Sequence, residues 1–246
     1  MALSRPRVLA IPGLLCDESV WAAQIAALDA VADVTVVDLT AFDDITDMAR
    51  AALRTVDGQV HVVGHSLGGR IAFEIWRLAP ERVRSLVVLD TGVDPAAPGE
   101  QERRQIVLDL AVDGMDALAA AWLPPMVHPD RRTDEGFMAP LRDMVQRFDR
   151  TQHARQITAL LRRPDAAPLL GSITVPTLVV VGRQDAWSPL AQHERIAAAI
   201  PGARLEVVEN SGHMVTVERP DVIAALLVDW VTACDHAPSG ESPADC

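Results

Sequence analysis

Short apolar runs alternate along this chain with longer segments in which apolar residues recur every three or four positions. The short runs predict buried strands, and the longer periodic segments predict amphipathic helices. The predicted strands lie near residues 7–11, 33–38, 59–64, 83–90, 176–182 and 203–208. Because strands that alternate with helices pair in parallel, we expect an α/β fold. Its central sheet should be mostly parallel, with helices on both faces.

One long interval breaks this alternation. About 85 residues without a strand pattern separate Asp90 from Pro176. The helical candidates in this interval lie near residues 100–112, 114–122, 135–149 and 152–162. A structureless loop of that length is uncommon in a compact domain, so we expect a helical cap over one edge of the sheet. The expected parts are a core of residues 1–91 and 171–234, a cap of residues 92–170 and a disordered tail of residues 235–246.

The segment Gly64-His65-Ser66-Leu67-Gly68 joins a predicted strand to a predicted helix through a turn built around a serine. A turn this sharp strains its central residue, and glycine on either side avoids a clash with the neighbouring backbone. Ser66 is therefore a candidate nucleophile, although a small residue in a tight turn is the simpler alternative. A serine hydroxyl is weakly nucleophilic at neutral pH and needs a histidine base, which an acid orients.

Two loops further along the chain offer this base and this acid. Asp185 follows the strand near 176–182, and His213 follows the turn after the strand near 203–208. Because the carboxyl ends of parallel strands meet at one edge of a sheet, both side chains should lie near Ser66. Asp90, at the end of an earlier strand, and Glu209, close to His213, are alternative acids.

The chain order nucleophile, acid, histidine resembles that of the α/β-hydrolase superfamily, and the resemblance spans roughly residues 7–233. The motifs that carry it are Gly-His-Ser-Leu-Gly-Gly at 64–69, Gly-Arg-Gln-Asp at 182–185 and Ser-Gly-His at 211–213. The resemblance implies an oxyanion hole formed by the backbone N–H groups of Leu67 and of Leu14, which lies in the loop after the first strand. Many relatives carry His-Gly where this chain has Pro12-Gly13, so a neighbour of Leu14 stays open as the second donor.

Apolar residues of the cap interval supply a candidate pocket. Methionine and aromatic side chains form adaptable apolar walls, which favours a small, largely apolar substrate. The candidate substrate-binding residues are Trp122, Met126, Phe137, Met138, Trp187 and Met214. Further cap residues that could face the catalytic ones are Ile106, Leu110, Leu118, Met144, Val145 and Phe148. The cap helices could instead form a dimer surface, so a monomer and a homodimer are both open.

Composition excludes several other functions. The chain has no lysine, which argues against Walker-type phosphate loops and Schiff-base enzymes. Its net charge of −12 opposes binding to nucleic acid and to anionic membranes. No apolar run approaches the ~20 residues of a membrane helix, and no signal peptide is recognisable. Three scattered cysteines suit a cytoplasmic protein.

No cofactor and no metal are expected. His61 and His65 are four residues apart, but they straddle a strand and a turn, and no carboxylate completes a zinc motif. We expect a cofactor-independent serine hydrolase that cleaves a carboxylic ester, a lactone or a thioester. The resemblance implies carbon–carbon bond hydrolysis or perhydrolysis as alternatives. A non-catalytic receptor that uses the hydrolase pocket is the alternative from another class.

Overall fold

The computed structural model describes residues 5–236. Its centre is a six-stranded sheet in the order β2-β1-β3-β4-β5-β6, and every neighbouring pair is parallel. The strands are β1 (Arg7–Ile11), β2 (Asp33–Val36), β3 (Val60–His65), β4 (Val83–Leu89), β5 (Thr177–Gly182) and β6 (Arg204–Val208). Each lies at the position that the apolar runs predict, so the expected α/β fold class is confirmed.

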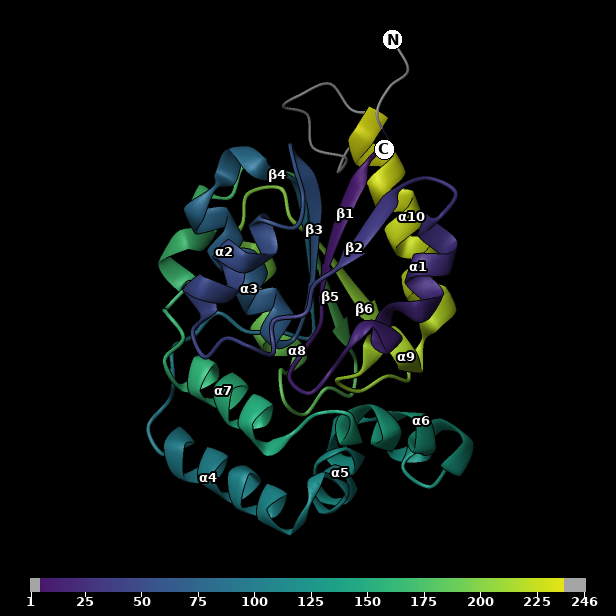
Figure 1. Cartoon of the computed structure of the whole chain (residues 1–246). Coiled ribbons are helices and arrows are strands. Elements are labelled where there is room, and N and C mark those ends of the chain that lie inside the picture. The colour runs from purple at the N-terminus through teal and green to yellow at the C-terminus, as the bar shows by residue number, and fades with distance from the viewer. Residues whose placement is uncertain (1–4, 237–246) are drawn as a thin grey trace.

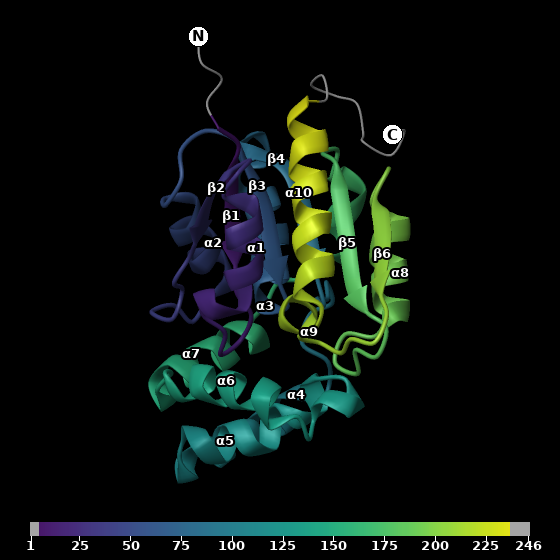
Figure 2. The same ribbon diagram turned by 90° about the vertical axis from the view of Figure 1, so that its right-hand side faces the viewer.

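Helices cover both faces of this sheet (Figures 1 and 2). The α-helices are α1 (Ala22–Leu28), α2 (Ile45–Leu53), α3 (Leu67–Leu78), α4 (Glu100–Leu110), α5 (Met115–Trp122), α6 (Glu135–Gln146), α7 (Arg150–Leu161), α8 (Leu190–Ala199), α9 (Val215–Glu218) and α10 (Pro220–His236). The 3-10 helices are η1 (Glu18–Trp21), η2 (Pro80–Arg82), η3 (Ala111–Asp113), η4 (Pro124–Met126), η5 (Pro129–Arg131) and η6 (Ala167–Ser172). Helices α2, α3 and α8 lie on one face, and α1 and α10 lie on the other.

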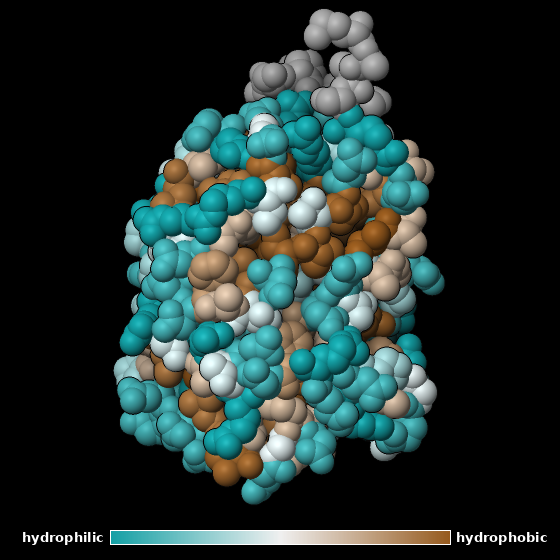
Figure 3. Space-filling view, in the orientation of Figure 1, coloured by the Kyte–Doolittle hydropathy of each residue, from teal (hydrophilic) through white to brown (hydrophobic). Residues whose placement is uncertain are grey.

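The burial of the strands follows their place in the sheet. Every residue of the inner strands β3 and β5 is buried, which their continuous apolar runs require in a sheet covered on both faces. Most residues of the edge strands β2 and β6 are only half-buried. A band of hydrophobic side chains appears over the β2 region when the molecule is seen from the side of Figure 1, while hydrophilic side chains cover most of the remaining surface (Figure 3).

Helices α4 to α7 lie as a separate layer across the carboxyl end of the sheet (Figures 1 and 2), and we call this layer the cap. One predicted boundary within it is wrong. The apolar pattern suggested a helix to residue 149, but α6 ends at Gln146 and Asp149 caps the start of α7. The Asp149 carboxylate accepts the N–H of Gln152, whose side chain bonds back to the Asp149 N–H. This capping box starts a new helix and so interrupts the pattern.

The carboxyl-terminal helix is longer than the sequence suggested. Helix α10 continues through His236, two residues into the segment expected to be a disordered tail. The rest of that segment, residues 237–246, lies outside the described residues. Within residues 5–236, the longest apolar helices fall short of the length and hydropathy needed to cross a membrane.

A histidine without hydrogen-bond partners is buried in the cap. His153 on α7 is fully buried, and neither of its ring nitrogens has a partner among residues 5–236. Burial, with a smaller effect from the charge of Arg104, lowers the pKa of His153 to about 4. In the unfolded chain the pKa of a histidine is ~6.5. The stability linked to His153 is therefore fully present above that pH and is lost as the pH falls toward 4.

We expect His153→Met to stabilise the protein. At pH 7 the free energy of unfolding should rise by about 1 kcal/mol, because an unpaired imidazole is no longer buried. At pH 5 the gain should be larger by about 2 kcal/mol, because the variant lacks a group that takes up a proton only on unfolding. Urea denaturation at both pH values measures the two effects. If the variant were less stable than the wild type at both pH values, the His153 imidazole would have a hydrogen-bond partner in solution.

Candidate active site

The turn between β3 and α3 places Ser66 in a strained conformation. Its backbone angles are φ 55° and ψ −112°. Two glycines allow this turn, because a Cβ at Gly64 would lie 2.3 Å from the carbonyl oxygen of Gly68, and a Cβ at Gly68 would lie 2.0 Å from that of Ile11. The Ser66 N–H donates to the Leu89 carbonyl at 2.8 Å, which ties the turn to the neighbouring strand. The strained turn thus directs the Ser66 side chain away from the carboxyl edge of the sheet.

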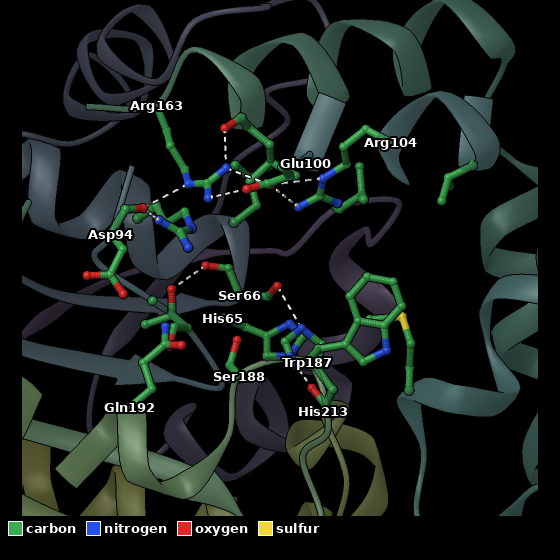
Figure 4. A pocket seen from close by; sticks show the side chains of 18 of the residues that line it. His65, Ser66, Asp94, Glu100, Arg104, Arg163, Trp187, Ser188, Gln192 and His213 are labelled. Carbon is green, nitrogen blue, oxygen red and sulfur yellow. Dashed lines mark hydrogen bonds and ion pairs between the residues drawn. The ribbon is translucent and has the colours of Figure 1, made fainter. Parts of the chain in front are cut away.

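Ser66, His213 and Asp185 form a continuous chain of hydrogen bonds. The Nε2 atom of His213 lies 2.8 Å from Ser66 Oγ, and its Nδ1 atom lies 2.8 Å from Asp185 Oδ2 (Figure 4). An ionised Asp185 accepts the Nδ1–H, which leaves Nε2 free to accept the serine hydroxyl hydrogen. His213 and Asp185 are buried, and Ser66 is half-buried at the wall of a cavity.

Asp185 stays ionised although it is buried. Burial, the largest influence, acts to raise its pKa, but the charge of His213 and hydrogen bonds together lower the pKa below its usual value. The Oδ1 atom accepts the N–H groups of Trp187 and Ser188 at 2.8 and 2.9 Å. Asp185 is therefore a fixed anion beside the imidazole, as the group that orients a catalytic histidine must be.

The two alternative acids do not contact His213. Asp90 is fully buried, and its oxygens accept the N–H groups of Gly182 and Val215 at 2.9 and 3.2 Å. Burial, together with the charge of Asp185, raises the pKa of Asp90 well above its usual value. Glu209 is exposed and pairs with Arg183. Asp90 thus joins backbone segments beneath the site, and Glu209 lies outside it.

The loop that carries His213 is held by residues that the sequence did not single out. The N–H of His213 donates to the Met126 carbonyl in the cap at 2.7 Å. The buried Glu218 carboxylate accepts the N–H groups of Gly212, Met214 and His128. The only sequence signal for Glu218 is a carboxylate directly after the mainly apolar segment 214–217. Its contacts connect the histidine loop to the cap.

His65, next to Ser66 in the chain, also supports this loop. Its Nε2–H donates to the His213 carbonyl at 2.7 Å. Burial, with a smaller effect from His213, lowers the pKa of His65 to about 4, so its ring is neutral at neutral pH. His61 contacts Ser85 instead. Within the described part of the chain, no group of three His, Cys, Asp or Glu side chains is placed to hold a metal ion.

Leu14 and Leu67 both line the cavity beside Ser66. The Leu67 amide is the first of α3 and so has no acceptor within the helix. In the loop after β1, the Cys16 N–H donates to the Gly13 carbonyl, and the Leu15 N–H donates to Gln156 Oε1 at 3.0 Å. The Leu14 N–H has no acceptor among residues 5–236. Within residues 5–236, neither the Leu67 N–H nor the Leu14 N–H is taken by a protein acceptor, and their oxyanion role stays a prediction.

Gln156 is a second residue that sequence reasoning missed. It lies on α7 in the cap and is buried, and its side chain reaches the backbone of Leu15 in the core. Leu15 has a positive φ of 54°, an unfavourable conformation for leucine that its surroundings must maintain. A lone glutamine in an amphipathic helix gives no sequence signal for such a contact between residues 141 positions apart.

The cavity beside Ser66 has a volume of about 440 Å³. Four of the six predicted substrate-binding residues line it, namely Trp122, Met126, Trp187 and Met214. Phe137 and Met138 do not, which corrects the prediction for these two. Helix α6 packs against α5, Met138 is buried away from the cavity, and the Phe137 ring lies under the Arg131 guanidinium at 4.9 Å.

The side of helix α4 that faces the cavity is not the side that the sequence predicted. Ile106 was expected to point at the catalytic residues, but it is 63% exposed, and Val107 lines the cavity instead. Successive helical residues point about 100° apart, so a shift of one residue exchanges the cavity face for the solvent face. Of the other cap candidates, Phe148 lines a second cavity of about 280 Å³, which shares Cys16 and Leu67 with the first.

The expectation of a largely apolar pocket is correct for only part of the cavity. The lining includes the apolar side chains of Leu14, Leu67, Trp122, Met126 and Met214. Charged side chains gather on the side of the cap (Figure 4). These charged lining residues are Arg70, Asp94, Glu100, Arg103, Arg104 and Arg163. They come from α3, from α4 and the loop before it, and from the segment after α7, so the sequence pattern of any one segment does not reveal the cluster.

Sequence comparison places this site in a known family. The model of the family described as "Alpha/beta hydrolase family" matches residues 8–226. A protein from Pseudomonas savastanoi pv. phaseolicola (strain 1448A / Race 6), named putative carbamate hydrolase RutD, is 28% identical over 249 residues. The match covers 93% of this chain and 94% of that protein. The motifs around Ser66, Asp185 and His213 all lie within the matched range.

Two solved structures are similar over nearly the whole chain. A thermophilic esterase from Thermogutta terrifontis, solved with malate bound, has a TM-score of 0.85 at 25% identity, covering 93% of this chain and 90% of that one. The enol-lactonase from Burkholderia xenovorans LB400 has a TM-score of 0.84 at 25% identity, covering 94% of this chain and 92% of that one. Both share the sheet and the helices around it.

Proposed function

This chain belongs to the alpha/beta hydrolase family, and we propose that it is a cofactor-independent serine hydrolase that cleaves an ester-like bond of a small molecule. The observation that carries the proposal is the pair of 2.8 Å contacts that connect Ser66 Oγ through His213 to Asp185. Nucleophile, base and orienting acid are each within hydrogen-bond distance of the next, at the wall of a cavity.

The geometry supports a two-step reaction. In the first step Ser66 Oγ attacks the substrate carbonyl while Nε2 of His213 takes the hydroxyl proton, and Asp185 stabilises the imidazolium. The N–H groups of Leu67 and Leu14 donate to the oxyanion, each worth roughly 3 kcal/mol. His213 then returns the proton to the leaving group. In the second step water repeats the sequence on the acyl-enzyme, which releases the acid and restores Ser66.

Lactones and thioesters fit the same mechanism, because only the leaving group differs. The similar solved structures include an esterase and an enol-lactonase, and a relative is named a carbamate hydrolase. A turnover screen over esters, lactones, thioesters, carbamates and diketones, with and without hydrogen peroxide, ranks these reactions against carbon–carbon bond hydrolysis and perhydrolysis. A protein that binds these compounds but converts none of them would be a receptor.

We expect Ser66→Ala to abolish turnover of the best ester and to leave the melting temperature nearly unchanged, because the change removes one oxygen atom from a half-buried position. Loss of a triad member costs ~10⁴ to 10⁶ in kcat. The matched control is Ser188→Ala, in the same cavity. A fluorophosphonate probe should label the control variant at Ser66 and leave Ser66→Ala unlabelled. Residual Ser66→Ala activity above about one hundredth contradicts the assignment.

We expect Asp185→Asn to lower kcat by up to ~10⁴ with a melting temperature within a few degrees of the wild type, because asparagine favours the wrong imidazole tautomer. Asp90→Asn should lower kcat far less, since Asp90 contacts backbone N–H groups and not His213. Steady-state kinetics and thermal unfolding of both variants measure the contrast. The opposite order of kcat losses would assign the acid to Asp90. Two active variants would point to Glu209 or to a Ser-His dyad.

We expect Gln156→Met to lower kcat about tenfold while KM changes little. The variant loses the acceptor for the Leu15 N–H and so loosens the loop that presents Leu14. Loss of a complete oxyanion donor costs ~10² to 10³ in kcat, and a misplaced donor should cost less. Gln105→Met, at an exposed position on α4, is the control. A drop in melting temperature without a drop in kcat would show that the contact only stabilises the fold.

A further inference from the structure

The charged side of the cavity contains more positive than negative charge. Arg70, Arg104 and Arg163 surround one buried carboxylate, Glu100. Asp94 also lines the cavity, but its carboxylate pairs with Arg195 at 3.3 Å on the outer surface. Figure 4 shows Arg163, Glu100 and Arg104 together above Ser66. The groups that face the cavity therefore carry uncompensated positive charge in a partly desolvated place.

Arg163 and Glu100 already satisfy each other. Two Arg163 nitrogens contact the two Glu100 oxygens at 2.8 and 2.7 Å, in a bidentate pair. The remaining Arg163 N–H groups donate to the carbonyls of Asp94, Pro95 and Leu160. All five guanidinium N–H groups thus have an acceptor. This pair holds the start of α4 to the segment after α7 and leaves no donor of Arg163 for a ligand.

Arg70 and Arg104 are the partly buried arginines with donors to spare, whereas Arg103 is exposed to solvent. Among residues 5–236, Arg70 makes one hydrogen bond, from Nη1 to the Asp94 carbonyl at 2.9 Å. Arg104 donates through Nε and Nη2 to the Glu100 oxygen that Arg163 also uses, at 3.3 and 3.2 Å, and its Nη1 has no acceptor among residues 5–236. The Arg104 side chain is only 17% exposed. Burial and the neighbouring charge of Arg163 lower the pKa of Arg70 to about 9, which is the effect of an unmatched cation.

The unmatched guanidiniums share a cavity with the nucleophile. Arg70 lies in the first turn of α3, which begins directly after Ser66. Both residues line the same cavity. A molecule of a few carbon atoms in that cavity can therefore place a carbonyl at Ser66 and an anionic group at Arg70.

We propose that Arg70 and Arg104 form a carboxylate subsite and that the substrate is an ester-like compound with a free carboxylate at its other end. This proposal rests on the proposed hydrolase function. A guanidinium fork matches a carboxylate, whereas phosphate sites generally add backbone N–H groups at a helix N-terminus. The Ala97 N–H, which precedes α4, is already taken by the Glu100 carboxylate.

The first experiment compares matched esters with the wild-type enzyme. The 4-nitrophenyl monoesters of succinate, glutarate and adipate are measured against the same compounds with the far carboxylate methylated. A second series places the carboxylate on the leaving group. It compares the butyrate ester of 4-hydroxybenzoate with the butyrate ester of methyl 4-hydroxybenzoate, which is neutral. We expect kcat/KM to favour the carboxylate form at least tenfold in one of these series, as charge-assisted hydrogen bonds predict. Equal values in every series would overturn the subsite.

The second experiment changes the arginines. Arg70→Met and Arg104→Met should each lower the carboxylate preference at least tenfold, while Arg155→Met, an exposed position on α7, should preserve it. Far-ultraviolet circular dichroism and melting temperature show whether each variant folds. A preference that survives in both folded variants would overturn the assignment to these residues.

A binding measurement separates the subsite from catalysis. Glutarate, glutaramide and inorganic phosphate are titrated against the Ser66→Ala protein at constant ionic strength, with calorimetry as the readout. We expect glutarate to bind at least tenfold more tightly than either of the others, and Arg70→Met in the same background to remove this binding. Phosphate binding as tight as glutarate would overturn the carboxylate assignment. An enzyme that hydrolyses neutral esters but binds no glutarate keeps the proposed function and loses the subsite. A protein that binds glutarate but hydrolyses no ester keeps the carboxylate subsite and loses the proposed hydrolase function.

Discussion

The site depends on the close backbone contact at the turn between β3 and α3. There the carbonyl oxygen of Gly68 approaches the position where Gly64 would carry a Cβ, and Ile11 approaches Gly68 in the same way. These contacts hold Ser66 at a positive φ. Because the interiors of proteins are close-packed and do not deform easily, the strained turn persists. Ser66 and Leu67 then line the same cavity, and the hydrogen bond from the Ser66 N–H to the Leu89 carbonyl further fixes the turn.

The cap contributes to the site as well as covering it. Met126 holds the backbone of His213 through its carbonyl, and Gln156 holds the loop of Leu14 through its side chain. Both contacts cross from the cap to the core. Each pairs a buried backbone N–H group that would destabilise the fold if it had no acceptor. Movement of the cap would therefore change the positions of His213 and of Leu14, the proposed oxyanion donor, together.

The charge of each buried ionisable group in the cavity depends on the partners that surround it. Asp185 keeps its charge because His213 and two N–H groups face it, whereas burial near that charge raises the pKa of Asp90. Arg163 is neutralised by Glu100, but no carboxylate remains for Arg70. The same desolvation thus leaves an anion at the imidazole and unpaired cations in the cavity that Ser66 lines. The proposed substrate would place its carbonyl at Ser66 and its carboxylate at these cations.

The sequence alone determined the strands, the parallel sheet, the cap helices and the chain order of Ser66, Asp185 and His213, because each rests on local periodicity or on a short motif at a strand end. It could not place Phe137, Met138 or Ile106, because the side of a helix that faces a cavity depends on how that helix packs. It left Asp185 and Asp90 open, since both follow strands at one edge. Only the tertiary structure brought Gln156, Glu218 and the arginines to the site, through contacts between segments far apart in the chain that no local pattern encodes.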